Sequence, residues 1–209
     1  SIFARTVLAV FGLMLVFEGI DKAGKTTQAR LLTKRLKKEG YRCKMISFPV
    51  YTTPIGRELK LSLYGRRNYP PQVKYLLMSA NRWEMKKELE SSGLDFLILN
   101  RYKHSNIAYG VASGLDRKWL ETLDQGLPEP NKVILLDISP STSLKRKLRG
   151  RDLNEKDLKY LKRVRKTYLK IAKEYGWSVV NAEQDVKEVH KEVWSLVKQV
   201  IRKQSTPNP

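Results

Sequence analysis

The sequence predicts an α/β protein in which a parallel five-stranded sheet is flanked by helices. Three observations carry this prediction: strand-like runs alternate with helical patterns along the chain, two of the runs are apolar throughout, and a glycine-rich loop joins the first strand to the first helix. Such alternation is typical of parallel sheets, because each crossover helix returns the chain to the same end of the sheet. No repeat or linker-like segment divides residues 13–203, so we expect them to form a single domain.

Five short runs rich in apolar residues are expected to be strands. They fall at residues 13–18, 42–48, 95–100, 132–137 and 177–181. Residues 96–99 (F-L-I-L) and 133–136 (V-I-L-L) contain no polar side chain. Continuous apolar runs of this length indicate strands that are buried on both faces of the sheet.

Helical patterns separate these strands, near residues 25–39, 71–91, 103–113, 140–149, 155–175 and 184–203. In the first pattern Ala29, Leu32 and Leu36 share one face, and Gly40 follows as a typical stop. The last pattern places valines at the spacing of a core-facing stripe, at Val186, Val189, Val193, Val197 and Val200.

The two ends of the chain do not fit this scheme. Residues 6–17 are largely apolar and follow Arg5, but no small-residue cleavage site follows them, and they lead directly into the glycine-rich loop. The stretch is also too short to span a bilayer. We expect residues 1–12 to be an atypical leader, with Met14 as a candidate start of the functional domain, and residues 204–209 to be a tail.

Composition limits the class of protein further. Among 209 residues there are one cysteine, Cys43, and two histidines, which exclude a disulfide framework and a zinc cluster. Low cysteine usage fits a reducing cytoplasm. The net charge of +20 leaves two alternatives, a solvated basic surface or binding of nucleic acid. We favour the first and expect neither nucleic acid nor a membrane as a partner.

Residues 19–26 form the complete phosphate-binding pattern G-x-x-x-x-G-K-[ST], between an apolar run and a helical pattern. Backbone N–H groups and the helix N-terminus create a positive concavity for phosphate in this arrangement. We expect Lys25 to reach the β- and γ-phosphates of ATP and Thr26 to ligate Mg²⁺. The expected ATP-binding residues of the loop are Gly19, Ile20, Asp21, Lys22, Ala23, Gly24, Lys25, Thr26 and Thr27.

The remaining strand ends favour a transferase over a hydrolase. Two candidate strands end in Asn100 and Asp137, and neither is followed by a second acid that would activate water. A basic segment near residues 145–154 comes before a long helix. A lid there would close cations over the triphosphate, with Arg146 and Arg151 in catalysis and Arg149 on ATP. The alternative is a helix end whose cations are favoured by the helix dipole.

Several motifs, in the same order along the chain, resemble those of the thymidylate (dTMP) kinases, which are P-loop nucleoside monophosphate kinases. They are residues 17–28 (F-E-G-I-D-K-A-G-K-T-T-Q), 48–49 (F-P), 76–84 (L-L-M-S-A-N-R-W-E), 100–102 (N-R-Y) with 105–106 (S-N) and 108–109 (A-Y), and 126–130 (G-L-P-E-P). The resemblance covers about residues 14–181. It implies transfer of the γ-phosphoryl group of ATP to dTMP, giving dTDP and ADP, and a homodimer.

The resemblance also implies roles for residues around the loop. Asp21 would accept a hydrogen bond from the deoxyribose 3′-hydroxyl, and Lys22 would stabilise charge on the transferring phosphoryl group. Arg101 would clamp phosphate and Phe48 would wall the acceptor pocket. The catalytic group expected overall is Lys25, Lys22, Arg101, Asn100, Arg146 and Arg151.

Base recognition is implied for two pairs of residues that each share a helix face. Met78 and Arg82 are spaced i, i+4, and by resemblance they pack on thymine and bind a base carbonyl. Asn106 and Tyr109 are spaced i, i+3, and would read the pyrimidine edge and crowd a ribose 2′-hydroxyl.

Three residues depart from the family pattern. Asn100 stands where the family has an aspartate that holds Mg²⁺ through water, Tyr51 where it often has an arginine for the acceptor phosphate, and Met78 where it has an aromatic ring. A charged hydrogen bond is stronger than a neutral one by roughly 1–2 kcal/mol, so we expect activity weakened by about tenfold or more and sensitive to the metal. Two alternatives remain: a kinase for a different pyrimidine acceptor, and a basic nucleic-acid-binding P-loop NTPase.

Overall fold

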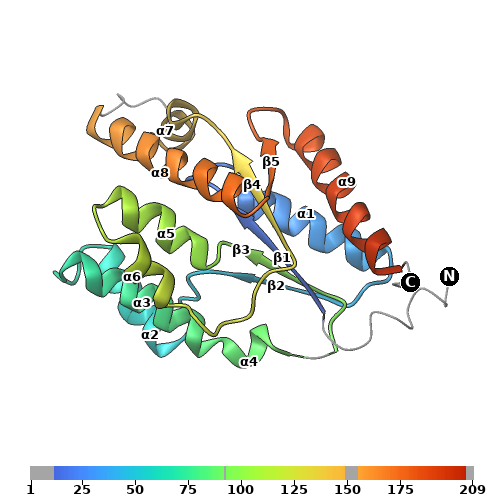
Figure 1. Cartoon of the computed structure of the whole chain (residues 1–209), viewed down its shortest axis with the longest axis horizontal. Coiled ribbons are helices and arrows are strands. Elements are labelled where there is room, and N and C mark those ends of the chain that lie inside the picture. The colour runs from blue at the N-terminus through green and yellow to red at the C-terminus, as the bar shows by residue number, and fades with distance from the viewer. Residues whose placement is uncertain (1–11, 92, 149–154, 206–209) are drawn as a thin grey trace.

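Five parallel strands lie side by side at the centre of the protein (Figure 1). This computed structural model describes residues 12–91, 93–148 and 155–205. The strands occur in the order β2-β3-β1-β4-β5, which confirms the predicted fold class. Their bounds are β1 Leu13–Glu18, β2 Cys43–Ser47, β3 Phe96–Asn100, β4 Lys132–Asp137 and β5 Ser178–Asn181.

The sheet order places the site before any side chain is considered. In the sheet, β3 and β2 lie on one side of β1, and β4 and β5 lie on the other. In register, Phe17 of β1 lies opposite Asn100 of β3 and Ile134 of β4. Ligands of open α/β sheets bind outside the carboxyl ends of the strands where the order changes direction, and here that point lies between β1 and its two neighbours.

Helices cover both faces of the sheet (Figure 1). Their bounds are α1 Lys25–Lys38, α2 Pro54–Leu63, α3 Pro71–Glu84, α4 Lys86–Leu89, α5 Lys103–Ala112, α6 Arg117–Thr122, α7 Pro140–Leu148, α8 Glu155–Glu174 and α9 Val186–Ser205. All six residues of β1 are buried, because helices pack against both of its faces.

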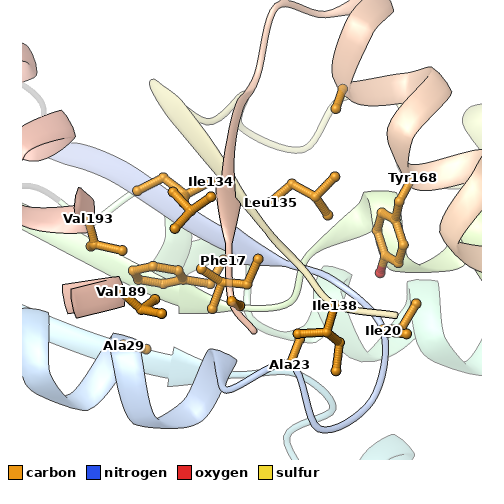
Figure 2. Close-up of a cluster of buried hydrophobic side chains, with 14 of the residues drawn as sticks. Phe17, Ile20, Ala23, Ala29, Ile134, Leu135, Ile138, Tyr168, Val189 and Val193 are labelled. Atoms are coloured by element: carbon orange, nitrogen blue, oxygen red, sulfur yellow. The ribbon is translucent and has the colours of Figure 1, made fainter. Parts of the chain in front are cut away.

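The alternating side chains of β1 feed two separate cores. Phe17 points into the cluster that includes Ala29 of α1 and Val193 of α9, as Figure 2 shows. Met14 and Val16 point into a cluster on the opposite face, which also contains buried side chains from β2, β3 and β4. A strand packed on both faces is held firmly in place, and the loop that follows it inherits this fixed starting point.

Two short helices and one break were not predicted. α2 begins at Pro54 after an N-cap, Thr53, whose hydroxyl accepts from the backbone N–H of Gly56 (3.0 Å). α6 begins after Asp116, which caps it in the same way. The expected helix 71–91 is interrupted at Met85 (φ −95°, ψ 9°), which separates α3 from α4.

Other boundaries agree within two residues, as is usual for helix ends. α9 extends to Ser205, into the segment expected to be a tail. The expected leader (except Gly12), residues 149–154 of the expected lid and residues 206–209 lie outside the described residues. Within the described chain, no helix is long and apolar enough to cross a membrane.

Candidate active site

The phosphate loop connects the end of β1 to the first turn of α1. Three of its residues have positive φ angles: Gly19 (143°), Lys22 (63°) and Gly24 (92°). A Cβ on Gly19 would lie 2.4 Å from the carbonyl oxygen of Leu136, so only glycine fits there. This sequence of turns carries the chain around a concavity at the N-terminus of α1, which is the strand–loop–helix context expected for phosphate binding.

Lys25 lies across the mouth of this loop. Its side chain is buried, and Nζ donates to the carbonyl oxygens of Gly19 (2.9 Å) and Ile20 (2.7 Å). Burial and repulsion from Arg101 lower the pKa of Lys25 well below its usual value, while the carboxylate of Asp21 opposes the shift. A phosphate at the loop would favour the charged form of this ammonium group and would gain a direct charged contact.

Asn100, at the end of β3, faces the start of α1. Its amide Nδ2 donates to Oγ1 of Thr26 (2.9 Å) and to Oγ of Ser47 (3.3 Å). Its Oδ1 is buried and has no hydrogen-bond partner among the described residues. A buried acceptor without a partner costs free energy. Amide and hydroxyl oxygens can coordinate Mg²⁺ directly or accept a hydrogen bond from a water molecule bound to it. Thr26 and Asn100 therefore fit the predicted metal site, and Ser47 joins them without having been predicted.

A hydrogen-bonded group lies beside the loop and consists of Asp21, Arg101 and Tyr109. Nη2 of Arg101 lies 2.5 Å from Oδ1 of Asp21, and the hydroxyl of Tyr109 donates to the same oxygen (3.2 Å). Burial by itself would raise the pKa of Asp21, but Arg101, Lys25 and the Tyr109 hydroxyl outweigh it and hold that pKa below its usual value. The carboxylate is thus ionised at neutral pH and can accept a hydrogen bond from a ligand.

Glu18 accepts hydrogen bonds from the segments that surround this group. The residue is fully buried, and Oε1 accepts from the backbone N–H of Tyr102 (2.9 Å). Oε2 accepts from the hydroxyls of Ser105 (2.7 Å) and Tyr168 (2.9 Å). One carboxylate therefore joins β1, the start of α5 and the middle of α8. The sequence pattern does not reveal this role, although Glu18 lies inside the motif at residues 17–28.

A cavity of about 280 Å³ opens next to Asp21. All eight residues predicted to bind the acceptor line it: Asp21, Phe48, Tyr51, Met78, Arg82, Arg101, Asn106 and Tyr109. They come from the phosphate loop, the segment after β2, α3, the end of β3 and α5. The lining also includes residues that the sequence did not single out, among them Leu63, Lys74 and Tyr75.

Arg82 lies at a buried position in the wall of this cavity. Its Nε and Nη2 donate to the two carboxylate oxygens of Asp124 (2.9 and 2.8 Å), and Ser79 also donates to Asp124 (2.9 Å). Since the ion pair uses Nε and Nη2, Nη1 has no hydrogen bond to a described residue and is available to a ligand. Asn106 is also buried, and its amide donates to the carbonyl oxygen of Tyr75 (3.0 Å).

The helix α7, which contains residues 145–148 of the predicted lid, is hydrogen-bonded to the phosphate loop. Arg146 donates to the carbonyl oxygens of Lys22 (3.0 Å) and Ala182 (3.3 Å), and Ser143 donates to that of Asp21 (2.6 Å). The side chain of Lys22 itself is exposed. Two further predicted lid residues, Arg149 and Arg151, lie outside the described residues.

Comparisons with known proteins agree with this arrangement. The family model described as thymidylate kinase matches residues 17–193. A thymidylate kinase from Dictyostelium discoideum is 32% identical over 196 residues, which cover 92% of this chain and 87% of that protein. A probable thymidylate kinase from Thermococcus gammatolerans is 36% identical over 207 residues, covering 91% and 98%.

A solved structure shows the same likeness. The thymidylate kinase from Candida albicans aligns with a TM-score of 0.78 and 28% identity, over 96% of this chain and 97% of that one. The residues matched by the family model include both the phosphate loop and the elements that line the cavity. This chain belongs to the thymidylate kinase family.

Proposed function

We propose that this kinase transfers the γ-phosphoryl group of ATP to dTMP, giving dTDP and ADP. One observation carries the proposal: Asp21 belongs both to the phosphate loop and to the lining of the acceptor cavity. A donor held by the loop and an acceptor held in the cavity would therefore meet at one residue. Bringing two reactants into line in this way supplies much of the catalysis in phosphoryl transfer.

The cations around this meeting point suit the chemistry. An oxygen of the acceptor phosphate attacks the γ-phosphorus, and the bond to the oxygen of the leaving ADP breaks. The transition state therefore carries negative charge on the oxygens of the transferring group and on the oxygen that leaves with ADP. Lys25 and Arg101 lie at the loop to stabilise that charge, with Lys22 and the lid arginines as further proposed contributors. Mg²⁺, held by Thr26 and through water by Asn100, would neutralise the phosphate oxygens of ATP.

Acceptor choice is the open part of the proposal. The cavity wall carries Met78 and Tyr51 where the family resemblance implies an aromatic ring and an arginine. A thioether packs on a base with less geometric demand than a ring. A related enzyme from Candida albicans is described as having broad substrate specificity. We therefore keep a different pyrimidine monophosphate as a second candidate acceptor, while no comparison favours a nucleic-acid-binding NTPase.

The test is a coupled assay of ADP release with dTMP, dUMP, the ribonucleotide TMP, dCMP and AMP. We expect the fastest turnover with dTMP. A faster rate with another pyrimidine would establish the second candidate, and no turnover with any pyrimidine monophosphate would refute both. Lys25→Ala serves as the control for the loop: it should lower the rate by a factor of about 100 or more while leaving the circular dichroism spectrum unchanged.

Two further expectations belong to this proposal. A homodimer is implied by the family resemblance, and apolar side chains are exposed on α2 and α3, including Leu61, Leu63 and Leu76. A cytoplasmic location is implied by the single cysteine. Sedimentation velocity would measure the first, and imaging of the protein in its host cell the second.

A further inference from the structure

Three cations line the acceptor cavity: Lys74, Arg82 and Arg101. Two of them are already matched by carboxylates. Arg82 pairs with Asp124 (2.8 Å), and Arg101 pairs with Asp21 (2.5 Å). A nucleoside monophosphate brings about two negative charges, so it needs positive charge beyond these neutralised pairs.

Lys74 is the third cation, and it has no hydrogen bond or salt bridge to any described residue. It lies half-buried on α3, and its Nζ is 5.5 Å from the centroid of the Tyr75 ring. Burial lowers its pKa, while the negative charge of Asp21 acts in the opposite direction. A partly desolvated ammonium without a carboxylate partner is unfavourable, which is the state expected of a group that binds an anionic ligand.

The position of Lys74 along α3 decides which part of the ligand it meets. It lies one helical turn before Met78 and two turns before Arg82, about 12 Å from Arg82 along the helix axis. Arg82 is held at its end of the cavity by Asp124. Lys74 instead feels the charge of Asp21, a residue of the phosphate loop. The free cation is therefore at the phosphate-loop end of the cavity.

Tyr51 lines the same cavity but brings no positive charge. Burial raises the pKa of its phenol, so the group is neutral at pH 7. It can donate one hydrogen bond to a phosphate oxygen and cannot balance the phosphate charge.

We propose that Lys74 binds the phosphate of the acceptor monophosphate, supplies the positive charge that Tyr51 does not, and so makes the cavity select nucleotides over nucleosides. This inference rests on the proposed function, because it assumes a pyrimidine monophosphate in the cavity. Lys74 is then a substrate-binding residue that is specific to the phosphate, whereas Met78 and Arg82 contact the base.

The experiment compares dTMP with thymidine, which lacks the phosphate, by isothermal titration calorimetry. Lys74→Met keeps most of the apolar stem and removes the charge. We expect its Kd for dTMP to rise by about tenfold or more, since a charged contact to phosphate is lost, and its Kd for thymidine to stay within about twofold. Lys87→Met is the matched control: Lys87 is exposed on α4 and does not line the cavity, so both Kd values should match the wild type.

A second variant tests whether charge is the cause. Adding Tyr51→Arg to Lys74→Met should recover most of the affinity for dTMP without changing that for thymidine. The proposal is overturned if Lys74→Met leaves dTMP binding unchanged, or weakens dTMP and thymidine equally, which would place Lys74 on the base or sugar. If the wild type binds no pyrimidine monophosphate at all, the proposed function fails first and this inference fails with it.

Discussion

At the scale of single residues, Asn100 shows how one amide alters a site without altering the fold. Its Nδ2 is bonded to Thr26 and Ser47, and its Oδ1 remains buried without a partner among the described residues. An amide at this point offers one neutral acceptor, where a carboxylate would offer two charged ones. The effect falls on the metal and its waters, because the backbone of β3 is fixed by its neighbours on both sides.

Asn100→Asp should raise kcat. The carboxylate would hold the metal and its waters more tightly, and the hydroxyls of Thr26 and Ser47 can rotate to donate to it. A gain of roughly 1–2 kcal/mol corresponds to a rate increase of about tenfold. The measurement is kcat as a function of Mg²⁺ concentration, and the variant should saturate at lower Mg²⁺. A lower kcat would mean that Asn100 has a different function in this enzyme.

His104 makes the stability of the protein depend on pH. Burial, helped by Lys103 and Arg82, lowers the pKa of its imidazole to about 3. Below pH 6.5 the unfolded chain takes up a proton that the folded protein does not, so stability should be lost as the pH falls from 6.5 towards 3. The slope from this one group is about 1.4 kcal/mol per pH unit.

The check is urea unfolding between pH 7 and pH 4 for the wild type and for His104→Phe. Phenylalanine keeps a ring against Trp177, whose centroid is 4.7 Å from that of His104, and Nδ1 has no hydrogen bond among the described residues to lose. As the pH falls, the free energy of unfolding of the variant should decline less steeply than that of the wild type. The difference in slope should correspond to the uptake of about one proton. His190→Gln is the comparison, since His190 is less buried. Parallel curves for wild type and His104→Phe would contradict the assignment.

The motif residues of the site could be predicted from the sequence, but the carboxylates that hold them in position could not. The eight acceptor residues line one cavity because each motif lies at a strand end or on a single helix face, which local spacing reveals. The carboxylates that hold them are far away in sequence. Asp124 is 42 residues from Arg82, and Glu18 is 150 residues from Tyr168. Neither pair has a pattern that one sequence could expose, because both depend on how the helices pack.

At the scale of secondary-structure elements, a buried ion pair anchors α3. Arg82 anchors it through Asp124 to the segment after α6, and both side chains are at most 3% exposed. The strands and long helices were predictable from their apolar patterns. α2 and α6 were not, because they are short and begin at the N-caps Thr53 and Asp116 rather than with an apolar stripe.

Asp124→Asn should destabilise the protein by about 3–5 kcal/mol, because it leaves the buried guanidinium of Arg82 without a counter-charge. It should also raise the KM for dTMP, since Arg82 is a cavity residue. Glu58→Gln is the control at an exposed ion pair, with Arg67, and should cost about 1 kcal/mol or less. Equal losses in the two variants, measured by urea unfolding, would show that the buried pair does not anchor α3.

At the scale of the whole molecule, the dominant property is a net charge of +20 at pH 7. Like charges on one surface repel each other, and this repulsion is relieved when the chain expands. Exposed ion pairs such as Glu155 with Lys159 and Glu188 with Lys191 offset little of it.

Sodium chloride should therefore stabilise the protein. Raising the ionic strength from about 0.01 M to about 0.15 M shortens the screening length from about 30 Å to about 8 Å, which weakens long-range repulsion more than contact ion pairs. We expect the free energy of unfolding in urea to increase over this range. A decrease would show that local ion pairs outweigh the net charge.

The path of α9 has a consequence for how the molecule can be attached to something else. This helix starts beside α1, where Gln28 donates to the carbonyl oxygen of Val186 (3.0 Å). It then runs along α1 to the end of the sheet at which the strands begin (Figure 1). There Lys203 is close enough to Lys132, at the start of β4, to affect its pKa. β1 also starts at this end of the sheet. A fused domain, a dye or a solid support could therefore be attached before β1 or after α9. It would lie on the side of the enzyme opposite the nucleotide-binding site, whose entrance would stay open.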